Sequence, residues 1–232
     1  MDRVLVVTAH PDDVDFGAAG TVAAFTAVGV DVAYCVVTDG EAGGNDRSLP
    51  RGDMATLRRR EQEAAAACVG VTDVTFLGYP DGRLVPSLEL RRDVTRVVRR
   101  FRPQRVLAPS PQRDWGRIFA SHPDHLAAGE AAVAAVYPDA RNPFAHPELL
   151  EEGLEPWTVG ELWLMAFPGS TVVVETTATF DAKLAALLSH RSQIGDPAGM
   201  GDRIRQWALA TARDAGLPDG SLAEAFRAIT TA

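Results

Sequence analysis

Short apolar runs alternate along this chain with longer segments in which hydrophobic residues recur at helical spacing. Apolar runs of four to eight residues, bounded by polar turns, are typical of buried strands. They predict strands at Val4–Thr8, Val30–Val37, Val74–Leu77, Arg105–Ala108, Glu161–Phe167 and Thr171–Glu175. Helical periodicity or composition predicts helices at Gly17–Ala27, Met54–Cys68, Leu88–Phe101, His122–Val136, Phe180–His190, Ile204–Ala215 and Leu222–Ala228.

This order of elements favours an α/β fold with a Rossmann-like, doubly wound, mostly parallel sheet flanked by helices. Strands that alternate with helices form parallel sheets whose two faces are both covered. A chain of 232 residues fits one large domain of this kind. We therefore predict a single domain over residues 1–232, with a core at 1–195 and a helical C-terminal extension at 196–232.

Two segments between these elements are too polar or too rich in proline for regular structure. Residues 38–53 are rich in glycine, aspartate and asparagine and predict a loop. Residues 138–156 contain four prolines and are too long for a plain connector. We expect both segments to form the rim of a binding site.

Charge and composition exclude several classes of protein. The 31 acidic residues exceed the 23 basic ones, which gives a formal net charge of −8, and such a field repels nucleic acid. No apolar run approaches the roughly 18–20 residues that span a bilayer, and Val4–Val7 is too short for a signal peptide. We therefore expect a cytoplasmic protein with no membrane partner, in which Cys35 and Cys68 are free thiols.

Three of the five histidines fall into two short clusters that are rich in aspartate. Residues 10–13 (His-Pro-Asp-Asp) directly follow the first predicted strand, and residues 122–125 (His-Pro-Asp-His) lie beyond the fourth. In the common strand order 3-2-1-4-5, strands one and four are neighbours where the order reverses, and ligands bind at that point. We therefore expect the two clusters to face each other across a crevice.

The residue types in these clusters suit a metal ion. His10 and Asp13 are three residues apart in a turn, and His122 and His125 share one face of a helix. Two imidazoles and one carboxylate make a three-ligand set with a vacant position for water, which is typical of a catalytic zinc site. The alternative is that the paired aspartates only cap a helix and that the His-x-x-His spacing is coincidental.

Both clusters resemble the motifs of the PIG-L/LmbE family of metal-dependent N-acetylglucosamine-type deacetylases. The specific similarity lies at residues 9–13 (Ala-His-Pro-Asp-Asp) and 122–125. Weaker similarities lie at 38–41 (Thr-Asp-Gly-Glu), at Arg58 with Glu61, at 77–82 (Leu-Gly-Tyr-Pro-Asp-Gly) and at 190–193 (His-Arg-Ser-Gln). The matches therefore extend over most of the chain, from about residue 4 to residue 193.

The resemblance implies a Rossmann-like hydrolase that removes an N-acyl group, expected to be acetyl, from an amino-sugar-containing small molecule. The reaction would proceed by attack of a zinc-bound water. The resemblance assigns His10, Asp13 and His125 as the zinc ligands. Iron is an alternative metal, because imidazole and carboxylate ligands suit both ions.

The same resemblance assigns Asp12 as general base, His122 as the group that stabilises the developing oxyanion, and Asp124 as the orienting partner of His122. A carboxylate beside the metal can take the proton of the attacking water, and one oxyanion donor is worth roughly 3–4 kcal/mol. We expect Asp124 to keep His122 charged, although Asp124 could instead be a helix N-cap. Some relatives carry a tyrosine where this chain has Ala120. Either His122 and the metal suffice without it, or another residue replaces it, or turnover of acetyl-sugars is poor.

The resemblance also assigns Arg58, Asp81 and Glu41 to substrate binding. The alternatives are that Arg58 is a solvated residue on a surface helix and that Asp81, with the glycine after it, only forms a turn. We expect His146 and His190 to have no part in catalysis.

Other functional classes remain as alternatives to a zinc-dependent N-deacetylase or amidase. One is a catalytically weak or silent sugar- or metal-binding member of the same fold, although the presence of Asp12 argues against it. Another is an amidase of a thiol-sugar conjugate. A nucleotide-binding protein is excluded, because G-x-G-x-x-G does not follow the first strand. The expected partner is a small-molecule amino-sugar conjugate, and residues 202–228 could supply a homo-oligomer interface.

Overall fold

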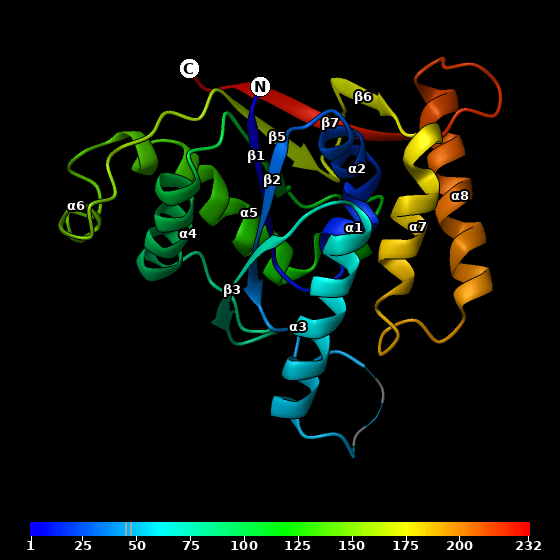
Figure 1. The fold of residues 1–232 in the computed structure, drawn as a ribbon, viewed down its shortest axis with the longest axis horizontal. Coiled ribbons are helices and arrows are strands. Elements are labelled where there is room, and N and C mark those ends of the chain that lie inside the picture. The colour runs from blue at the N-terminus through cyan, green and yellow to red at the C-terminus, as the bar shows by residue number, and fades with distance from the viewer. Residues whose placement is uncertain (45, 47) are drawn as a thin grey trace.

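The computed structural model describes residues 1–44, 46 and 48–232, and its centre is a seven-stranded sheet in the order β3-β2-β1-β4-β5-β7-β6 (Figure 1). The strands are β1 (Arg3–Thr8), β2 (Asp31–Thr38), β3 (Asp73–Tyr79), β4 (Arg105–Pro109), β5 (Glu161–Met165), β6 (Val172–Glu175) and β7 (Ala223–Thr230). Strands β1 to β5 pair in parallel, and β7 is antiparallel to both of its neighbours. The predicted α/β class and the order 3-2-1-4-5 are therefore confirmed.

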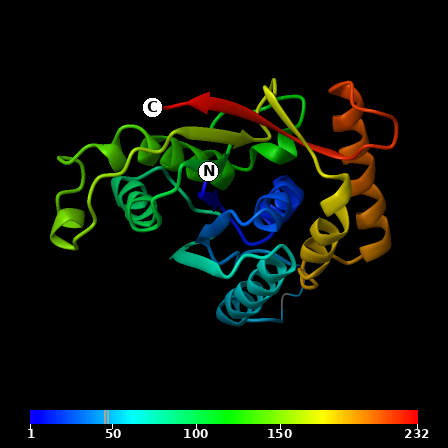
Figure 2. The same cartoon turned by 45° about the horizontal axis from the view of Figure 1, so that its top comes forward.

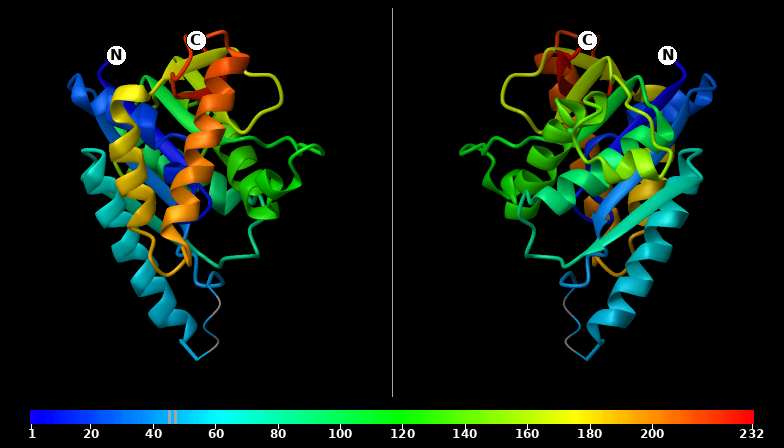
Figure 3. Two further views of the ribbon diagram at one scale, coloured as in Figure 1. Left: turned by 90° about the vertical axis from the view of Figure 1, so that its right-hand side faces the viewer. Right: turned by 90° about the vertical axis from the view of Figure 1, so that its left-hand side faces the viewer.

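Helices cover both faces of the sheet because its central strands are apolar on both sides. The helices are α1 (Asp13–Gly17), α2 (Ala19–Ala27), α3 (Arg51–Cys68), α4 (Leu88–Phe101), α5 (Pro123–Val136), α6 (Glu148–Glu151), α7 (Phe180–Leu188) and α8 (Pro197–Asp214). In β1, Leu5 and Val7 pack with α4 and α5, whereas Val4 and Val6 pack with α2 and α3 on the other face, as the two-residue period of a strand requires. Helix α8 lies alongside α7 at one end of the molecule (Figures 1 and 3).

Small residues bring α5 close to the sheet. Its buried positions are mostly alanine, and a Cβ atom on Gly129 would lie 2.4 Å from the carbonyl oxygen of Pro109 at the end of β4. No larger residue fits at position 129 without moving the helix. This contact places the first turn of α5, with residues 122–125, beside the carboxyl ends of β1 and β4.

Two predicted helices differ from the structure. The helix predicted over Gly17–Ala27 consists of α1 and α2, separated by Ala18. The helix predicted over Leu222–Ala228 is wrong, because residues 223–228 belong to β7, the C-terminal strand drawn in red in Figure 2. This strand lies between β5 and β6 in the sheet. Alanine, leucine and glutamate favour a helix locally, but pairing with two strands decides the outcome. The helical extension predicted at 196–232 is therefore helical only in α8.

The segment 138–156 does not form a rim of the crevice, contrary to the prediction. Helix α5 carries the chain away from the carboxyl ends of the strands, so the segment lies at their amino ends. There Arg99 donates to the carbonyl oxygens of Asp139 and Asn142, at 3.0 and 2.8 Å. Trp157, just after the segment, donates to the carbonyl oxygen of Pro103, which precedes β4.

The loop predicted over residues 38–53 lies between β2 and α3, and α3 begins at Arg51, earlier than predicted. Its positions 45 and 47 lie outside the described residues. No helix formed by the described part of the chain is both long and apolar enough to cross a bilayer.

Candidate active site

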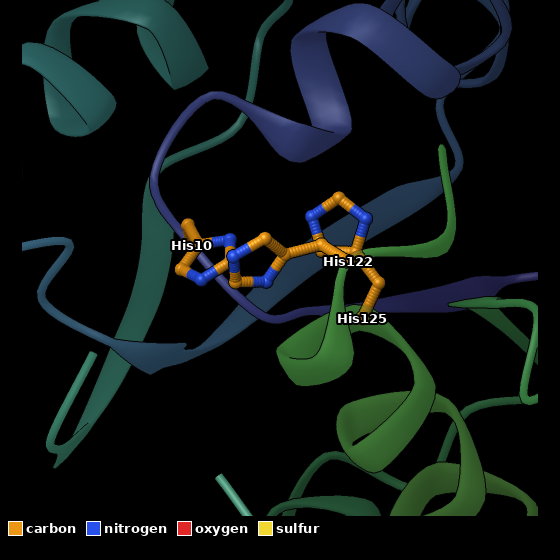
Figure 4. A group of neighbouring side chains, drawn as sticks. All are labelled: His10, His122 and His125. Carbon is orange, nitrogen blue, oxygen red and sulfur yellow. The ribbon is translucent and has the colours of Figure 1, made fainter. Parts of the chain in front are cut away.

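Residues 10–13 and 122–125 meet at the carboxyl ends of β1 and β4, as the strand order predicts. The ring centroids of His10 and His122 are 5.0 Å apart, those of His10 and His125 are 5.2 Å apart, and those of His122 and His125 are 5.4 Å apart. Figure 4 shows the three imidazoles converging from the loop after β1 and from the start of α5. Two segments more than 100 residues apart in sequence thus form one cluster.

Asp13 joins two of these imidazoles. Its Oδ1 lies 3.0 Å from Nε2 of His125, and its Oδ2 lies 3.5 Å from Nδ1 of His10. The imidazole of His125 is oriented by its other nitrogen, since Nδ1 lies 3.3 Å from the carbonyl oxygen of Ala120. This arrangement, with one ring nitrogen held by an acceptor and the other facing the cluster, is common for metal-binding histidines.

Two groups of side chains within the described residues are compact enough to hold a metal ion. One contains His10, His122 and His125, and the other contains His10, Asp81 and Asp124. The side of the cluster that contains His10 and His125, with the carboxylate of Asp13 between them, is favoured over the second group, because Asp13 and His125 line a cavity of about 1040 Å³. The carboxylates of the second group already accept several hydrogen bonds and are almost completely buried.

Negative charge surrounds His10. Its Nε2 lies 3.1 Å from Oδ1 of Asp81 and 3.2 Å from Oδ2 of Asp124. Burial lowers the pKa of His10, but the carboxylates of Asp13, Asp124 and Asp81 outweigh burial and raise this pKa to about 12. The carboxylates around His10 thus stabilise a positive charge at this position. Together with the imidazole and carboxylate donors, this fits a divalent transition metal.

Asp12 lies beside the cluster in a strained backbone conformation. Its φ angle is 90°, in the left-handed region, which is costly for a residue with a side chain and often marks a functional site. Its backbone N–H donates to Oε1 of Gln62 at 2.8 Å, and its Oδ2 accepts from Arg58 at 3.0 Å. Burial and the neighbouring Asp13 raise the pKa of Asp12 to about 6, and Arg58 opposes this rise.

Asp124 orients the His122 ring through its backbone N–H and not through its carboxylate, contrary to the prediction. Its carboxylate accepts from the backbone N–H groups of Gly82 and Leu84, at 2.7 and 3.2 Å, and contacts His10. His122 itself caps α5, since its Nδ1 accepts from the backbone N–H of Asp124 at 3.2 Å. Burial, together with His10 and His125, lowers the pKa of His122, which favours the neutral ring over the expected charged one.

Arg58 is a buried residue and not a solvated one. Its guanidinium donates to the carbonyl oxygens of Gly40 and Pro11, at 2.9 and 2.6 Å, as well as to Asp12. Only 4% of the residue is exposed. Arg58 therefore holds the loop after β1 against the loop after β2.

Glu41 and Asp81 connect the loops after β2 and β3. The backbone N–H of Asp81 donates to Oε1 of Glu41 at 3.0 Å, and that of Ala42 donates to Oδ2 of Asp81 at 2.9 Å. Since Asp81 also contacts His10, the two loops are fixed relative to the histidine cluster. All nine predicted site residues thus lie in or directly against one site.

Sequence reasoning missed a buried network behind Asp12. Oδ2 of Asp15 lies 2.8 Å from Nε2 of His190 and accepts from Nε2 of Gln62 at 3.1 Å, while Gln62 holds the backbone of Asp12. Asp15, Gln62 and His190 are completely buried. Two signals were available. The spacing of Arg58 and Gln62, four residues apart on α3, puts both on one helix face, and the weak similarity at 190–193 begins with His190.

The sequence of this chain is similar to those of known deacetylases. A sequence profile of the PIG-L family, described as GlcNAc-PI de-N-acetylase, matches residues 5–136. Diacetylchitobiose deacetylase of Thermococcus kodakarensis is 31% identical over 191 residues, covering 82% of this chain and 70% of that protein. A probable N-acetyl-alpha-D-glucosaminyl L-malate deacetylase 2 of Bacillus cereus is 32% identical over 201 residues, covering 83% and 84%.

Structural similarity extends over the whole chain. The solved structure of N,N'-diacetylchitobiose deacetylase from Pyrococcus horikoshii, in complex with its inhibitor MPG, superposes with a TM-score of 0.90 at 31% identity. The match covers 99% of this chain and 84% of that one. It therefore includes β7 and α8, which lie beyond the residues that the family profile matches.

Proposed function

Because this chain belongs to the PIG-L family of de-N-acetylases, we propose that it hydrolyses the N-acyl group of a small amino-sugar conjugate. The products are a free amine and a carboxylic acid, with acetate as the expected acid. The observation that carries this proposal is the convergence of His10, Asp13 and His125 beside Asp12, in a site where Asp12, Asp13 and His125 line a cavity. The relatives, which are deacetylases of amino-sugar compounds, support the substrate class.

His10, Asp13 and His125 are the residues that would hold a divalent metal, and their donor atoms suit zinc or iron. When bound, such an ion supplies a Lewis acid for the amide carbonyl and lowers the pKa of water. The preference for this set over the three imidazoles rests on Asp13, whose two oxygens contact both His10 and His125. His122 then remains available for the substrate.

Asp12 is the proposed general base. With a pKa of about 6, its carboxylate is mostly ionised at neutral pH and can accept a proton from the attacking water. Arg58 holds Oδ2 of Asp12, which leaves Oδ1 for this proton. The same group can then give the proton to the departing amine.

His122 is the proposed donor to the amide oxygen as negative charge develops there. Its Nδ1 accepts a hydrogen bond from the backbone of Asp124, so a neutral ring carries its proton on Nε2. A neutral His122 is therefore already a donor and needs no positive charge for this role. One such donor is worth roughly 3–4 kcal/mol of transition-state stabilisation.

Arg58, Asp81 and Glu41 are proposed to shape the sugar subsite. The hydrogen bonds of Asp81 and Glu41 fix the loops after β2 and β3 at the histidine cluster. Arg58 contributes mainly by holding Asp12. Hydroxyl groups of the sugar are expected to contact these loops.

A panel of N-acetylated amino-sugar conjugates tests the proposal. Release of primary amine is measured after metal removal with a chelator and after readdition of zinc or ferrous ion, and metal analysis should give about one ion per chain. The Asp12→Asn variant should lose turnover, whereas Asp219→Asn, at an exposed carboxylate distant in sequence from both clusters, should keep it. A metal-loaded protein that binds these sugars but releases no amine would instead be a silent member of the fold.

A further inference from the structure

The cavity at the active site extends far beyond the reacting groups. Asp12, Asp13 and His125 line one end of it, and it continues between the 3₁₀ turn η1 (Ile118–Ser121), the loop 166–171 and helix α8. Its volume of about 1040 Å³ lies at the upper end of the range for pockets that bind drug-sized molecules. An acetylated monosaccharide would fill only part of this space.

The walls of this outer part, which we name the aromatic cleft, are mainly apolar. The apolar side chains are those of Phe16, Phe119, Phe167, Met200, Ile204 and Trp207, and Arg117, Arg203 and Asp214 also line this part. Phe119 and Trp207 come from η1 and α8, and their rings are nearly parallel, with 16° between the planes and 6.3 Å between the centroids. Phe119 is 64% exposed and Trp207 is 46% exposed. Large aromatic side chains are normally more buried than this, and neighbouring exposed ones often mark a binding site.

The charged side chains in the floor of the cleft are neutralised by one another. Nζ of Lys183 lies 2.6 Å from Oε1 of Glu224 and also donates to the carbonyl oxygen of Phe16. The Glu224 carboxylate accepts from the backbone N–H groups of Gly20 and Thr21, at 3.0 and 2.7 Å. Lys183 and Glu224 therefore add no unpaired charge to the cleft. Of the arginines that line it, Arg117 lies over the ring of Phe119, 5.5 Å from its centroid, and so belongs to the aromatic wall.

We propose that the aromatic cleft binds an apolar alkyl or aryl group that the substrate carries next to its reacting amide. Such a group is attached either to the acyl carbon or to the sugar, and in both cases its chemistry is the same. The inference rests on the proposed function, because Asp12 and His125 line the end of the cleft where the amide would react. Burial of apolar surface between Phe119, Trp207 and the floor would supply the binding free energy.

Four substrates separate the two sources of this group: N-acetylglucosamine, N-octanoylglucosamine, and the octyl and phenyl glycosides of N-acetylglucosamine. An apolar extension that enters the cleft should raise kcat/KM by about 10- to 200-fold relative to N-acetylglucosamine. A gain for the octanoyl compound assigns the cleft to the acyl group, and a gain for a glycoside assigns it to the aglycone. A gain below about twofold for every extension overturns the proposal.

Aromatic variants test the location of the binding site. Trp207→Ala and Phe119→Ala should remove most of the gain from the extended substrates. Trp115→Ala is the matched control, because Trp115 is 81% exposed and precedes η1 but does not line the cleft. If all three variants reduce the gain equally, the cleft is not the binding site.

Calorimetric binding of N-octanoylglucosamine and octyl N-acetylglucosaminide to metal-free protein separates this inference from the proposed function. If no substrate is turned over but binding depends on Trp207, the deacetylase proposal fails and the cleft proposal stands. If the wild-type protein dimerises and Trp207→Ala makes it monomeric, the cleft is instead an interface between copies of the chain. That result would overturn the proposal.

Discussion

Replacing Asp124 by asparagine should weaken metal binding, although Asp124 is not among the proposed ligands. Its Oδ2 and Oδ1 of Asp81 both contact Nε2 of His10, at 3.2 and 3.1 Å. With Nε2 held by these carboxylates, Nδ1 is the His10 nitrogen that faces Asp13 and is available to a metal. Loss of such an orienting partner typically reduces metal affinity 10- to 100-fold, which is about 1.4–2.8 kcal/mol.

The expected loss of metal affinity lies near the lower end of this 10- to 100-fold range, because Asp81 still contacts His10 in the single variant. We expect about tenfold weaker zinc binding for Asp124→Asn and closer to 100-fold when Asp81→Asn is added. A stability cost should accompany this loss. The carboxylate of Asp124 accepts from both Gly82 and Leu84, and asparagine has one acceptor oxygen, so one buried amide loses its partner at a cost of about 1–3 kcal/mol.

Zinc affinity is measured by competition with a chelating dye at a temperature where circular dichroism shows each variant folded. Asp139→Asn is the matched control, because Asp139 is also buried and its Oδ2 lies 3.1 Å from Nε2 of His146, away from the metal cluster. The control should lose stability but keep its zinc affinity. Zinc affinity of Asp124→Asn within twofold of wild type would refute the reasoning, and equal losses in both variants would attribute the effect to unfolding.

Three further results are expected. Chelation should lower the melting temperature, because a ligand at 100 times its Kd stabilises the native state by about 2.7 kcal/mol; an unchanged melting temperature after verified metal loss would contradict a site built into the fold. Asp12→Asn should lower kcat by about 10²- to 10⁴-fold with metal content retained, and loss of both together would make Asp12 a ligand. Native protein should react with thiol reagents at the exposed Cys68 and not at Cys35, because burial raises the pKa of Cys35 to about 12; two reactive thiols before unfolding would contradict this burial.

The meeting of the two histidine clusters could be predicted because it depends only on strand order. A buried β-branched run identified β1 and a short apolar run after Pro103 identified β4, and the reversal of strand order puts their carboxyl ends side by side. The partners of Asp124 could not be predicted in the same way. They depend on how the loop after β3 presents the N–H groups of Gly82 and Leu84, and no periodicity in the sequence encodes the path of a loop.

The walls of the aromatic cleft could not be predicted from the sequence for a related reason. The predicted rim at 138–156 lies at the other end of the sheet, whereas α8 and β7 supply walls of the aromatic cleft through Trp207 and Glu224. Residues 223–230 have a helix-favouring composition, and they form a strand only because β5 and β6 both pair with them.

The proposed reacting groups lie in one part of the chain, whereas the walls of the cleft come partly from that part, through Phe16 and Phe119, and partly from a later one. Residues 10–13 and 122–125 lie within the segment 5–136 that the family profile matches, while the loop 166–171, α8 and β7 lie after it. A metal centre tolerates few residue types at few positions, so short motifs preserve its chemistry. An apolar wall needs only volume and hydrophobicity, which many sequences supply. Substrate preference in this fold can thus change through α8 and its neighbours while the reaction proposed at His10 and Asp12 stays the same.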